Sequence, residues 1–262
     1  MATWRNFEID CTNYLNNKYG VYAKFVSFGG ANSNAPDITA KTNSGRFFGL
    51  EAKYCPAQSG QFVLLPDIAT RKFVYSSLNA TSPNMSACII LHHMNNLFDE
   101  YLEAGTKGKE IVFDNCTKVF YTWIIDYYKN KNVKYFITNN YIILPIEQFP
   151  NYFNVTAKYR VKRSGSNSVG KSNLSNVINY IESSFQIHGY KCIGPKLFIK
   201  APFGLHNTKF TLDDIKYMFS QRGNDYEIRK LSNTDNANVI FSIQLKSNQL
   251  KEDLIVFEND LL

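Results

Sequence analysis

Two carboxylates and a lysine stand at a spacing that could hold a metal ion: Asp37 is followed by Glu51 and Lys53, which are separated by one residue. Because side chains alternate between the faces of a strand, Glu51 and Lys53 point the same way if residues 46–53 form one. Two carboxylates and the Ala52 carbonyl make an all-oxygen corner that suits Mg²⁺. A metal there would acidify water and stabilise charge on a phosphate, while Lys53 positions or deprotonates the attacking water. The pattern predicts metal-assisted phosphodiester hydrolysis.

The same spacing also fits a half-exposed hairpin with an ordinary Glu–Lys pair, so the pattern alone leaves both interpretations open. Glu8 favours the functional one. It falls within the apolar stripe of a helix predicted over residues 4–19, and a carboxylate on the buried side needs a partner because an unpaired buried charge is costly. A metal site or Lys53 would supply that partner. The alternative is a glutamate at the edge of the stripe that reaches solvent.

The elements that must position these residues follow from hydrophobic periodicity and turn signals. Residues 36–41 and 46–53 are predicted as paired strands joined by a short turn, which brings Asp37 close to Glu51. Alternate side chains of the second strand then face the core: Phe48, Leu50 and Ala52. Helices are expected over 4–19, 86–103, 117–129, 174–186 and 212–220. Further strands are expected over 21–28, 133–138, 141–146, 159–163, 196–200, 226–231, 239–245 and 254–257.

This mixture of elements predicts an α/β or mixed α+β fold. The chain has 262 residues, of which 44% are hydrophobic, so it can bury a sizeable core. We find no repeat, long linker or low-complexity segment that would divide it, which favours a single domain over residues 1–262. The five cysteines are scattered and the four histidines have no partner at metal-ligand spacing, which argues against a disulfide scaffold or a zinc site. With no long apolar run and no signal segment, we expect a cytoplasmic protein.

The net charge of +7 is distributed unevenly along the chain. Residues 1–150 carry a net +2 and residues 211–262 a net −3, whereas residues 151–210 hold nine basic side chains and one acidic one. The carboxylate-free gap between Glu147 and Glu182 contains a cluster of basic residues: Lys158, Arg160, Lys162, Arg163 and Lys171. Such a cluster is typical of a polyanion site, and a solvated surface loop is the alternative.

Residues 165–172 match the phosphate-binding pattern G-x-x-x-x-G-K-[ST], between a possible strand and a possible helix. No convincing strand that ends in aspartate follows it to hold the metal of a bound nucleotide, so we favour a role in DNA binding for the same segment. Arg160, Lys162, Arg163 and Lys171 can neutralise phosphates or bind guanine O6 and N7 in the major groove. Secondary candidates for base or backbone contacts are Asn236 and Asn238.

The acidic motif, with the complete Pro36-Asp37 form of its first element, resembles the PD-(D/E)XK nucleases, and more narrowly type II restriction endonucleases. The similar blocks run almost from end to end, and similarity is poorest over residues 169–225. They are residues 7–8, 51–53, 60–64 with Pro66, 134–138, 145–147, 152–155, 164–166, 231–234 and 236–243.

The resemblance implies a central mixed sheet flanked by helices, with the catalytic core mainly in residues 1–150 and the DNA-recognition elements mainly in 151–262. It also implies a Mg²⁺-dependent enzyme of the bacterial cytoplasm that cuts both strands of duplex DNA at the palindrome GCGC, leaving 5′-phosphate and 3′-hydroxyl ends. A cognate DNA methyltransferase would belong to the same restriction–modification system. The protein itself would be a monomer or a homodimer.

By the same resemblance, Asp37, Glu51 and the Ala52 carbonyl would bind the metal, Lys53 would serve the water, and Glu8 and Gln61 would support the site. The expected DNA-binding residues are Arg160, Lys162, Arg163, Ser164, Ser166, Lys171, Asn236 and Asn238. Two other functions stay open from the residues alone. One is a repair or junction nuclease with the same catalytic corner, and the other is a non-catalytic DNA- or nucleotide-binding protein that uses residues 158–171.

Overall fold

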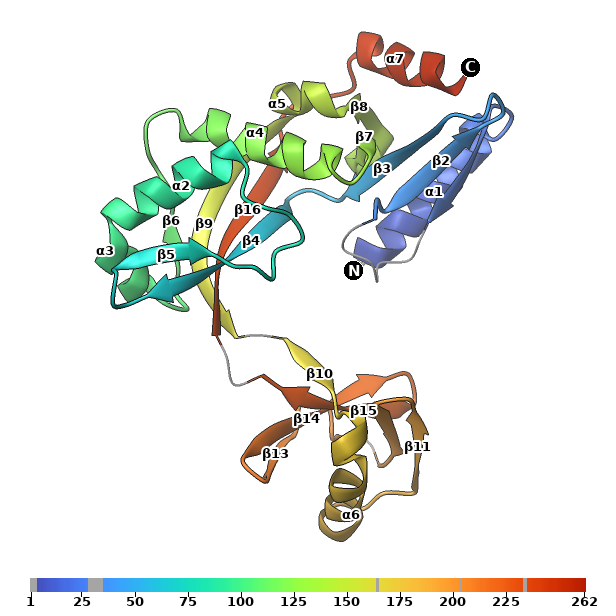
Figure 1. Ribbon diagram of the computed structural model, residues 1–262. Coiled ribbons are helices and arrows are strands. Elements are labelled where there is room, and N and C mark those ends of the chain that lie inside the picture. The colour runs from blue at the N-terminus through green and yellow to red at the C-terminus, as the bar shows by residue number, and fades with distance from the viewer. Residues whose placement is uncertain (1–3, 28–34, 164, 203, 233–234) are drawn as a thin grey trace. The chain divides into compact units, whose positions relative to one another are not determined.

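The computed structural model describes residues 4–27, 35–163, 165–202, 204–232 and 235–262 (Figure 1). The chain divides into two compact units. The first unit comprises residues 1–161 and 237–262, and the second comprises residues 162–236. The single domain expected over residues 1–262 stays a prediction. Among the described residues, no helix has both the length and the apolar character needed to cross a membrane.

The first unit contains a mixed five-stranded sheet in the order β1-β2-β3-β7-β8. Only β3 and β7 are parallel, and the other neighbours are antiparallel. Its strands are β1 (Ala23–Ser27), β2 (Ile38–Thr42), β3 (Phe47–Lys53), β7 (Val133–Thr138) and β8 (Ile142–Pro145). One face packs against α1 (Trp4–Tyr19) and α7 (Lys251–Leu261), through a core that includes Cys11, Leu15, Leu50 and Phe257. The expected mixed sheet flanked by helices is confirmed.

A second sheet of the first unit has the order β5-β4-β16-β9-β6. Its strands are β4 (Ala57–Asp67), β5 (Lys72–Tyr75), β6 (Lys109–Glu110), β9 (Phe153–Arg163) and β16 (Asp235–Leu245). It packs against helices α2 (Met85–Asn96), α3 (Phe98–Ala104), α4 (Cys116–Lys129) and α5 (Phe149–Tyr152). Helix α4 joins the two sheets, because Tyr128 contacts Phe136 of β7 while Trp123 stacks on Phe241 of β16.

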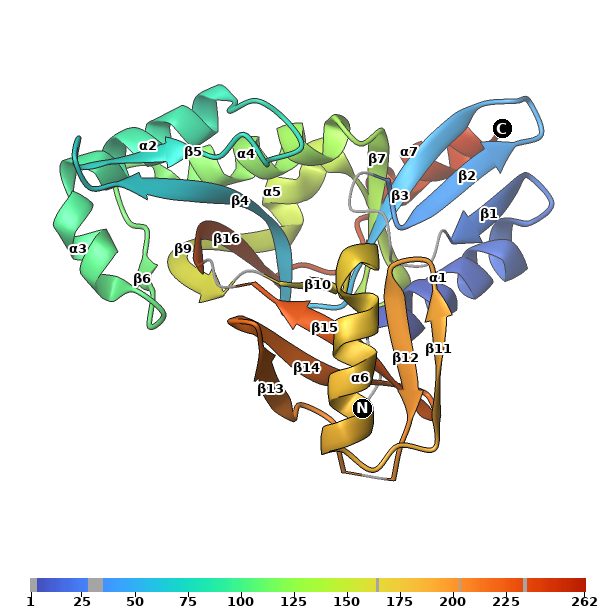
Figure 2. The same cartoon turned by 60° about the horizontal axis from the view of Figure 1, so that its bottom comes forward.

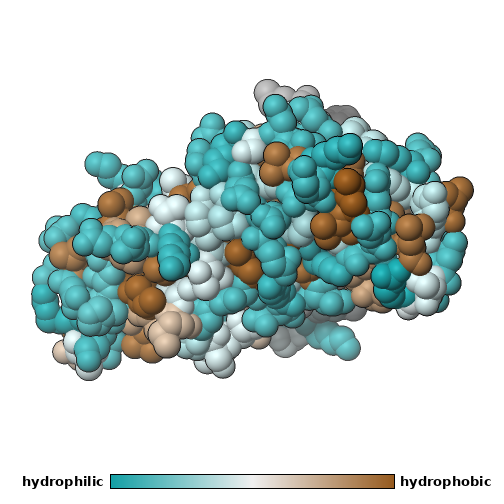
Figure 3. Space-filling model, turned by 90° about the horizontal axis from the view of Figure 1, so that it is seen from above, coloured by the Kyte–Doolittle hydropathy of each residue, from teal (hydrophilic) through white to brown (hydrophobic). Residues whose placement is uncertain are grey.

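The face of the molecule in Figure 3 is largely hydrophilic, with its apolar side chains in separate small groups.

The second unit is an antiparallel sheet in the order β11-β12-β15-β14-β13, with β10 paired to β15. Its strands are β10 (Ser166–Ser168), β11 (Gly189–Ile193), β12 (Lys196–Lys200), β13 (Lys209–Leu212), β14 (Ile215–Arg222) and β15 (Asp225–Leu231). Helix α6 (Leu174–Ser184) lies across one face of this sheet (Figure 2). Val177 and Ile181 of α6 join Leu197, Phe219 and Ile228 of the strands in a separate apolar core.

Two predicted elements are wrong. The expected helix over 212–220 is the β13–β14 hairpin, whose turn residues Asp213 and Asp214 have positive φ values of 50° and 60°. The expected strand over 254–257 is part of helix α7, in which Phe257 and Leu261 are buried one turn apart. The helix expected over 86–103 is divided at Leu97 into α2 and α3. The described residues also include three short 3₁₀ helices: η1 (Asn139–Tyr141), η2 (Ile146–Gln148) and η3 (Lys171–Asn173).

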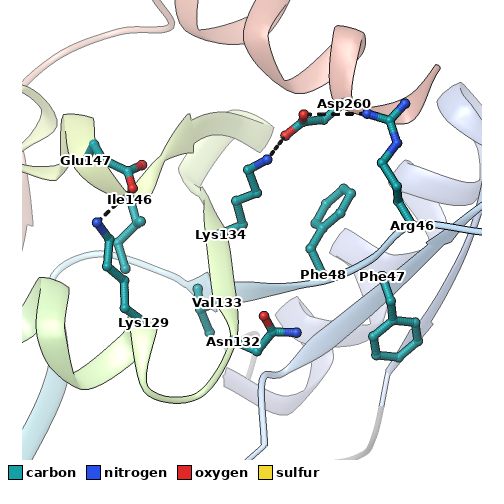
Figure 4. A pocket seen from close by; sticks show the side chains of 10 residues that line it. All are labelled: Arg46, Phe47, Phe48, Lys129, Asn132, Val133, Lys134, Ile146, Glu147 and Asp260. Carbon is teal, nitrogen blue, oxygen red and sulfur yellow. Dashed lines mark ion pairs between the residues drawn. The ribbon is translucent and has the colours of Figure 1, made fainter.

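One carboxylate, Asp260, joins the C-terminal helix to the first sheet. It accepts hydrogen bonds from the buried Tyr135 hydroxyl and from Lys134 Nζ at 2.5 Å, and it lies 3.9 Å from Arg46 Nη1. Lys134 and Arg46 reach Asp260 across a cavity of about 370 Å³, on whose other side Lys129 pairs with Glu147 (Figure 4). The cavity is therefore bordered by cations that already have carboxylate partners.

We predict that Asp260→Ala lowers the free energy of unfolding by about 1–3 kcal/mol, because the buried Tyr135 hydroxyl loses its charged acceptor. Urea unfolding followed by circular dichroism measures this change. The matched control is Asp99→Ala, which removes a carboxylate that is 55% exposed and paired with Arg71. Its expected cost is below about 1 kcal/mol. Equal losses in the two variants would contradict the assigned role of Asp260.

We also predict that the stability difference between wild type and Asp260→Ala depends on pH. Burial alone would raise the pKa of Asp260, but hydrogen bonds from Lys134 and Tyr135 and the Arg46 charge lower it below its ordinary value of 3.8. A carboxyl with a lowered pKa stabilises the fold above its ordinary pKa, and this contribution is lost as the pH falls through the lowered value. The stability difference between wild type and Asp260→Ala should therefore shrink below about pH 4. A difference that stays constant to pH 2 would exclude this explanation.

Candidate active site

Asp37, Glu51 and Lys53 meet at one end of the first sheet. In the antiparallel pair, Ile38 of β2 lies opposite Leu50 of β3, so Asp37 stands beside the last residues of β3. The Ala52 N–H donates a hydrogen bond of 3.1 Å to Asp37 Oδ2. Lys53 Nζ lies 2.5 Å from Glu51 Oε1 and 3.7 Å from Asp37 Oδ2. The predicted pairing of these two strands is confirmed, and it brings the three side chains together. We call this group the acidic corner.

Alternation along β3 separates the acidic corner from the apolar core. Phe48, Leu50 and Ala52 are buried in the layer formed with α1 and α7, as the sequence predicts. Glu51 and Lys53 face the other way, toward Tyr128 of α4. The acidic corner thus lies on a strand between two helical layers.

The acidic corner is largely withdrawn from water. Glu51 is 5% exposed, and its burial raises the pKa of the carboxyl to about 6, with opposing effects from the Lys53 and Lys131 charges. Burial disfavours the charge on Lys53, yet the Glu51 and Asp37 carboxylates together raise the pKa of its amine well above the ordinary value. Lys53 is therefore protonated at neutral pH. With both carboxylates ionised, the corner carries one net negative charge.

Tyr128 and Ser59 form a wall of the site that sequence reasoning missed. The Tyr128 ring centroid lies 6.0 Å from Lys53 Nζ, and Ser59 Oγ on β4 lies 3.3 Å from the Tyr128 hydroxyl. Burial raises the pKa of Tyr128 well above its ordinary value, so its hydroxyl stays neutral. The available signal was the helical spacing of Phe120, Ile124 and Tyr128, which shows the buried side of α4 but not what it faces.

The supporting residues implied by the resemblance lie in different surroundings. Glu8 is buried on α1, and its charge and that of Asp37 both contribute to a raised pKa of the Cys11 thiol. Burial, followed by the charges of Asp10, Asp37 and Glu8, raises the pKa of Cys11 to about 12. Gln61 is exposed on β4, and its Oε1 accepts a hydrogen bond of 3.1 Å from Gln58. Their roles stay predictions.

The donor set of the acidic corner fits a small divalent cation. The Lys53 ammonium, placed at ion-pairing distance from both carboxylates, shows that a positive charge is accommodated there. Carboxylate and carbonyl oxygens are the ligands that Mg²⁺ prefers, and this ion usually keeps several waters. Within the described ranges, no group of three or more His, Cys, Asp or Glu side chains gathers as a metal site. Asp37, Glu51 and the Ala52 carbonyl thus fit a metal that retains open positions.

The expected DNA-binding residues fall on both units. Lys162 and Lys171 are exposed, and Arg160 is exposed with its Nε bonded to the Thr106 carbonyl at 3.1 Å. Asn238 is 3% exposed on β16, and Asn236 is half-buried. Ser164 and the side chain of Arg163 lie outside the described residues. Their contacts with DNA stay predictions.

Ser166 belongs to a network in the second unit that the sequence did not indicate. Arg229 Nε donates to Ser166 Oγ at 3.1 Å, and Arg229 Nη1 donates to Glu227 at 2.6 Å. The same buried Glu227 carboxylate accepts from Arg222 Nε at 3.1 Å. Two arginines are thus oriented by one glutamate.

The segment that matches the nucleotide-binding pattern does not form a phosphate-binding loop. Residues 166–168 form strand β10, which pairs with β15. Gly170 has a φ of 87°, and α6 begins only at Leu174, after a 3₁₀ turn. Because a phosphate-binding loop must lead directly into the N-terminus of its helix, the match is one of sequence alone.

No family model matches this chain, and no curated protein matches it significantly. Among solved structures, the chain is similar to the HhaI endonuclease in complex with DNA, with 37% sequence identity and a TM-score of 0.84. The similarity covers 99% of each chain, so it includes the acidic corner as well as both units. The resemblance to restriction endonucleases is thereby confirmed over the full length. This chain belongs to the HhaI family of endonucleases.

Proposed function

We propose that this protein is a type II restriction endonuclease that hydrolyses phosphodiester bonds of double-stranded DNA at GCGC with Mg²⁺. The acidic corner carries the proposal, because it combines two carboxylates and a protonated lysine at the end of a strand. Support comes from the full-length similarity to an endonuclease solved with DNA. A cognate DNA methyltransferase would protect the host's own sites.

In the mechanism, Asp37, Glu51 and the Ala52 carbonyl would hold the cation. The chemistry that Mg²⁺ would supply there is Lewis acidity, for the activation of water and the stabilisation of charge on the phosphate. Lys53, which pairs with both carboxylates, would donate hydrogen bonds and orient the attacking water or a phosphate oxygen. The buried ring of Tyr128 packs beside Lys53 as one wall of the site.

Recognition of the duplex is assigned to exposed basic residues and to the arginine network of the second unit. Arg160, Lys162 and Lys171 can neutralise phosphates, which supplies affinity without sequence preference. Arg222 has a side chain that is 56% exposed, while its Nε is tied to Glu227. A guanidinium held by one edge keeps its remaining N–H groups oriented for guanine O6 and N7.

We predict that Lys53→Ala lowers the rate of DNA cutting by at least about 100-fold, since the water and phosphate lose an oriented charged donor. Binding of the duplex, measured by fluorescence anisotropy without divalent metal, should survive. Lys41→Ala removes an exposed lysine from the neighbouring strand β2 and serves as the matched control. Normal cutting by Lys53→Ala would refute the site assignment.

Incubation of plasmid DNA with the protein and Mg²⁺ is expected to give discrete fragments whose sequenced ends fall within GCGC. Removal of the metal with a chelator should stop cutting, and added Mg²⁺ should restore it. Glu51→Gln should stay inactive at every Mg²⁺ concentration, because a buried amide cannot replace the charged ligand.

Preference for branched DNA would instead identify a repair or junction nuclease. Binding without any metal-dependent cutting would identify a non-catalytic protein.

A further inference from the structure

Lys131 lies beside the acidic corner, in the short turn between α4 and β7. Its Nζ is 4.0 Å from the ring centroid of Tyr127 and 5.4 Å from that of Tyr128. The same Tyr128 ring lies 6.0 Å from Lys53 Nζ. Two lysine ammonium groups therefore approach one buried tyrosine, and only Lys53 belongs to the motif of the acidic corner.

Lys131 differs from the neighbouring lysines, Lys129 and Lys134, in the groups that its ammonium contacts. Lys129 pairs with Glu147 at 2.9 Å, and Lys134 pairs with Asp260 at 2.5 Å. In the part of the chain that the structure describes, no ion pair includes Lys131, and its close contacts are ring faces. A ring face attracts the ammonium without adding a negative charge. Lys131 thus keeps a net positive charge and N–H donors that an anion can use.

An aromatic column holds Lys131 in place. Phe241 stacks on Trp123 at 4.2 Å with an interplanar angle of 18°, and Trp123 stacks on Tyr127 at 4.8 Å and 15°. The Lys131 ammonium contacts the ring at the outer end of this column. Gly60 permits the arrangement, because a Cβ at this position would lie 2.7 Å from Trp123. A lysine ammonium that already packs against a column of rings loses less conformational entropy when it binds a ligand than one on a freely rotating side chain.

The acidic corner itself offers no binding group to the phosphates that flank the cleaved bond. Asp37 and Glu51 are carboxylates, and a cation bound to them would serve the phosphate that is hydrolysed. Lys53 is already engaged by both carboxylates, so it offers little attraction to a second anion.

We propose that Lys131 binds a phosphate of the DNA strand next to the phosphate that is hydrolysed at the acidic corner. This inference rests on the proposed function and adds a substrate-binding residue that lies outside the nuclease motif. Lys131 and Lys53 contact the same tyrosine ring, which places the two ammonium groups close enough to serve neighbouring phosphates of one strand. The contact holds the backbone beside the cleaved bond.

The first test compares Lys131→Met with Lys129→Met, a control two residues away whose lysine already has a carboxylate partner. Lys131→Met should weaken duplex binding and raise KM by about 10-fold, with a smaller change in kcat. It should also reduce the slope of log affinity against log salt by about 1. Lys131→Arg should restore most of the affinity, whereas Lys129→Met should behave as wild type. An unchanged salt slope, or an equal loss in both methionine variants, would overturn the proposal.

The second test uses the wild-type protein and duplexes in which one phosphate at a time is replaced by a neutral methylphosphonate. Replacement next to the mapped cleavage position should weaken wild-type binding, and it should cause no further loss in Lys131→Met or in Lys131→Gln. If no neighbouring replacement weakens the wild type, Lys131 does not bind this phosphate. A wild type that neither binds nor cuts duplex DNA would instead refute the proposed function itself.

Discussion

The register between β2 and β3 is the constraint on which the acidic corner depends. With Ile38 opposite Leu50, Asp37 reaches the end of β3 and accepts a hydrogen bond from the Ala52 backbone. A shift by one residue would turn Glu51 and Lys53 into the apolar layer and expose the residues that now fill it. The turn before β3 holds this register, because the Arg46 N–H donates to Thr42 Oγ1 at 3.0 Å.

Burial of Glu51 links the stability of the protein to its chemistry. A carboxylate that is 5% exposed needs a positive partner, and Lys53 supplies it at 2.5 Å. Binding of the proposed metal would therefore rearrange an existing cation–carboxylate cluster rather than create a charge in an apolar place. Helix α4 is part of the same arrangement, since Tyr128 covers the cluster while Trp123 packs on the second sheet.

Local patterns predicted most of the elements around the acidic corner. Helix α1 and the β2–β3 hairpin arise from periodicity and turn residues that lie close together in the sequence. The errors at 212–220 and 254–257 have a different origin, because alternation and helical spacing are ambiguous in short apolar runs. Tyr128 and Arg229 could not be assigned, since they have partners in distant elements. Glu51 is 77 residues before Tyr128, and Ser166 is 63 residues before Arg229.

The second unit, residues 162–236, enters the chain between β9 and β16, which are neighbours in one sheet of the first unit. It is in effect an insertion between two adjacent strands, and it has its own apolar core. An insertion of this kind can change in sequence or length while the strands that flank it keep their places in the sheet. The segment with the poorest resemblance, residues 169–225, lies entirely inside it. Under the proposed assignment of DNA contacts to the second unit, the fold allows DNA specificity to diversify within this insertion while the acidic corner stays the same.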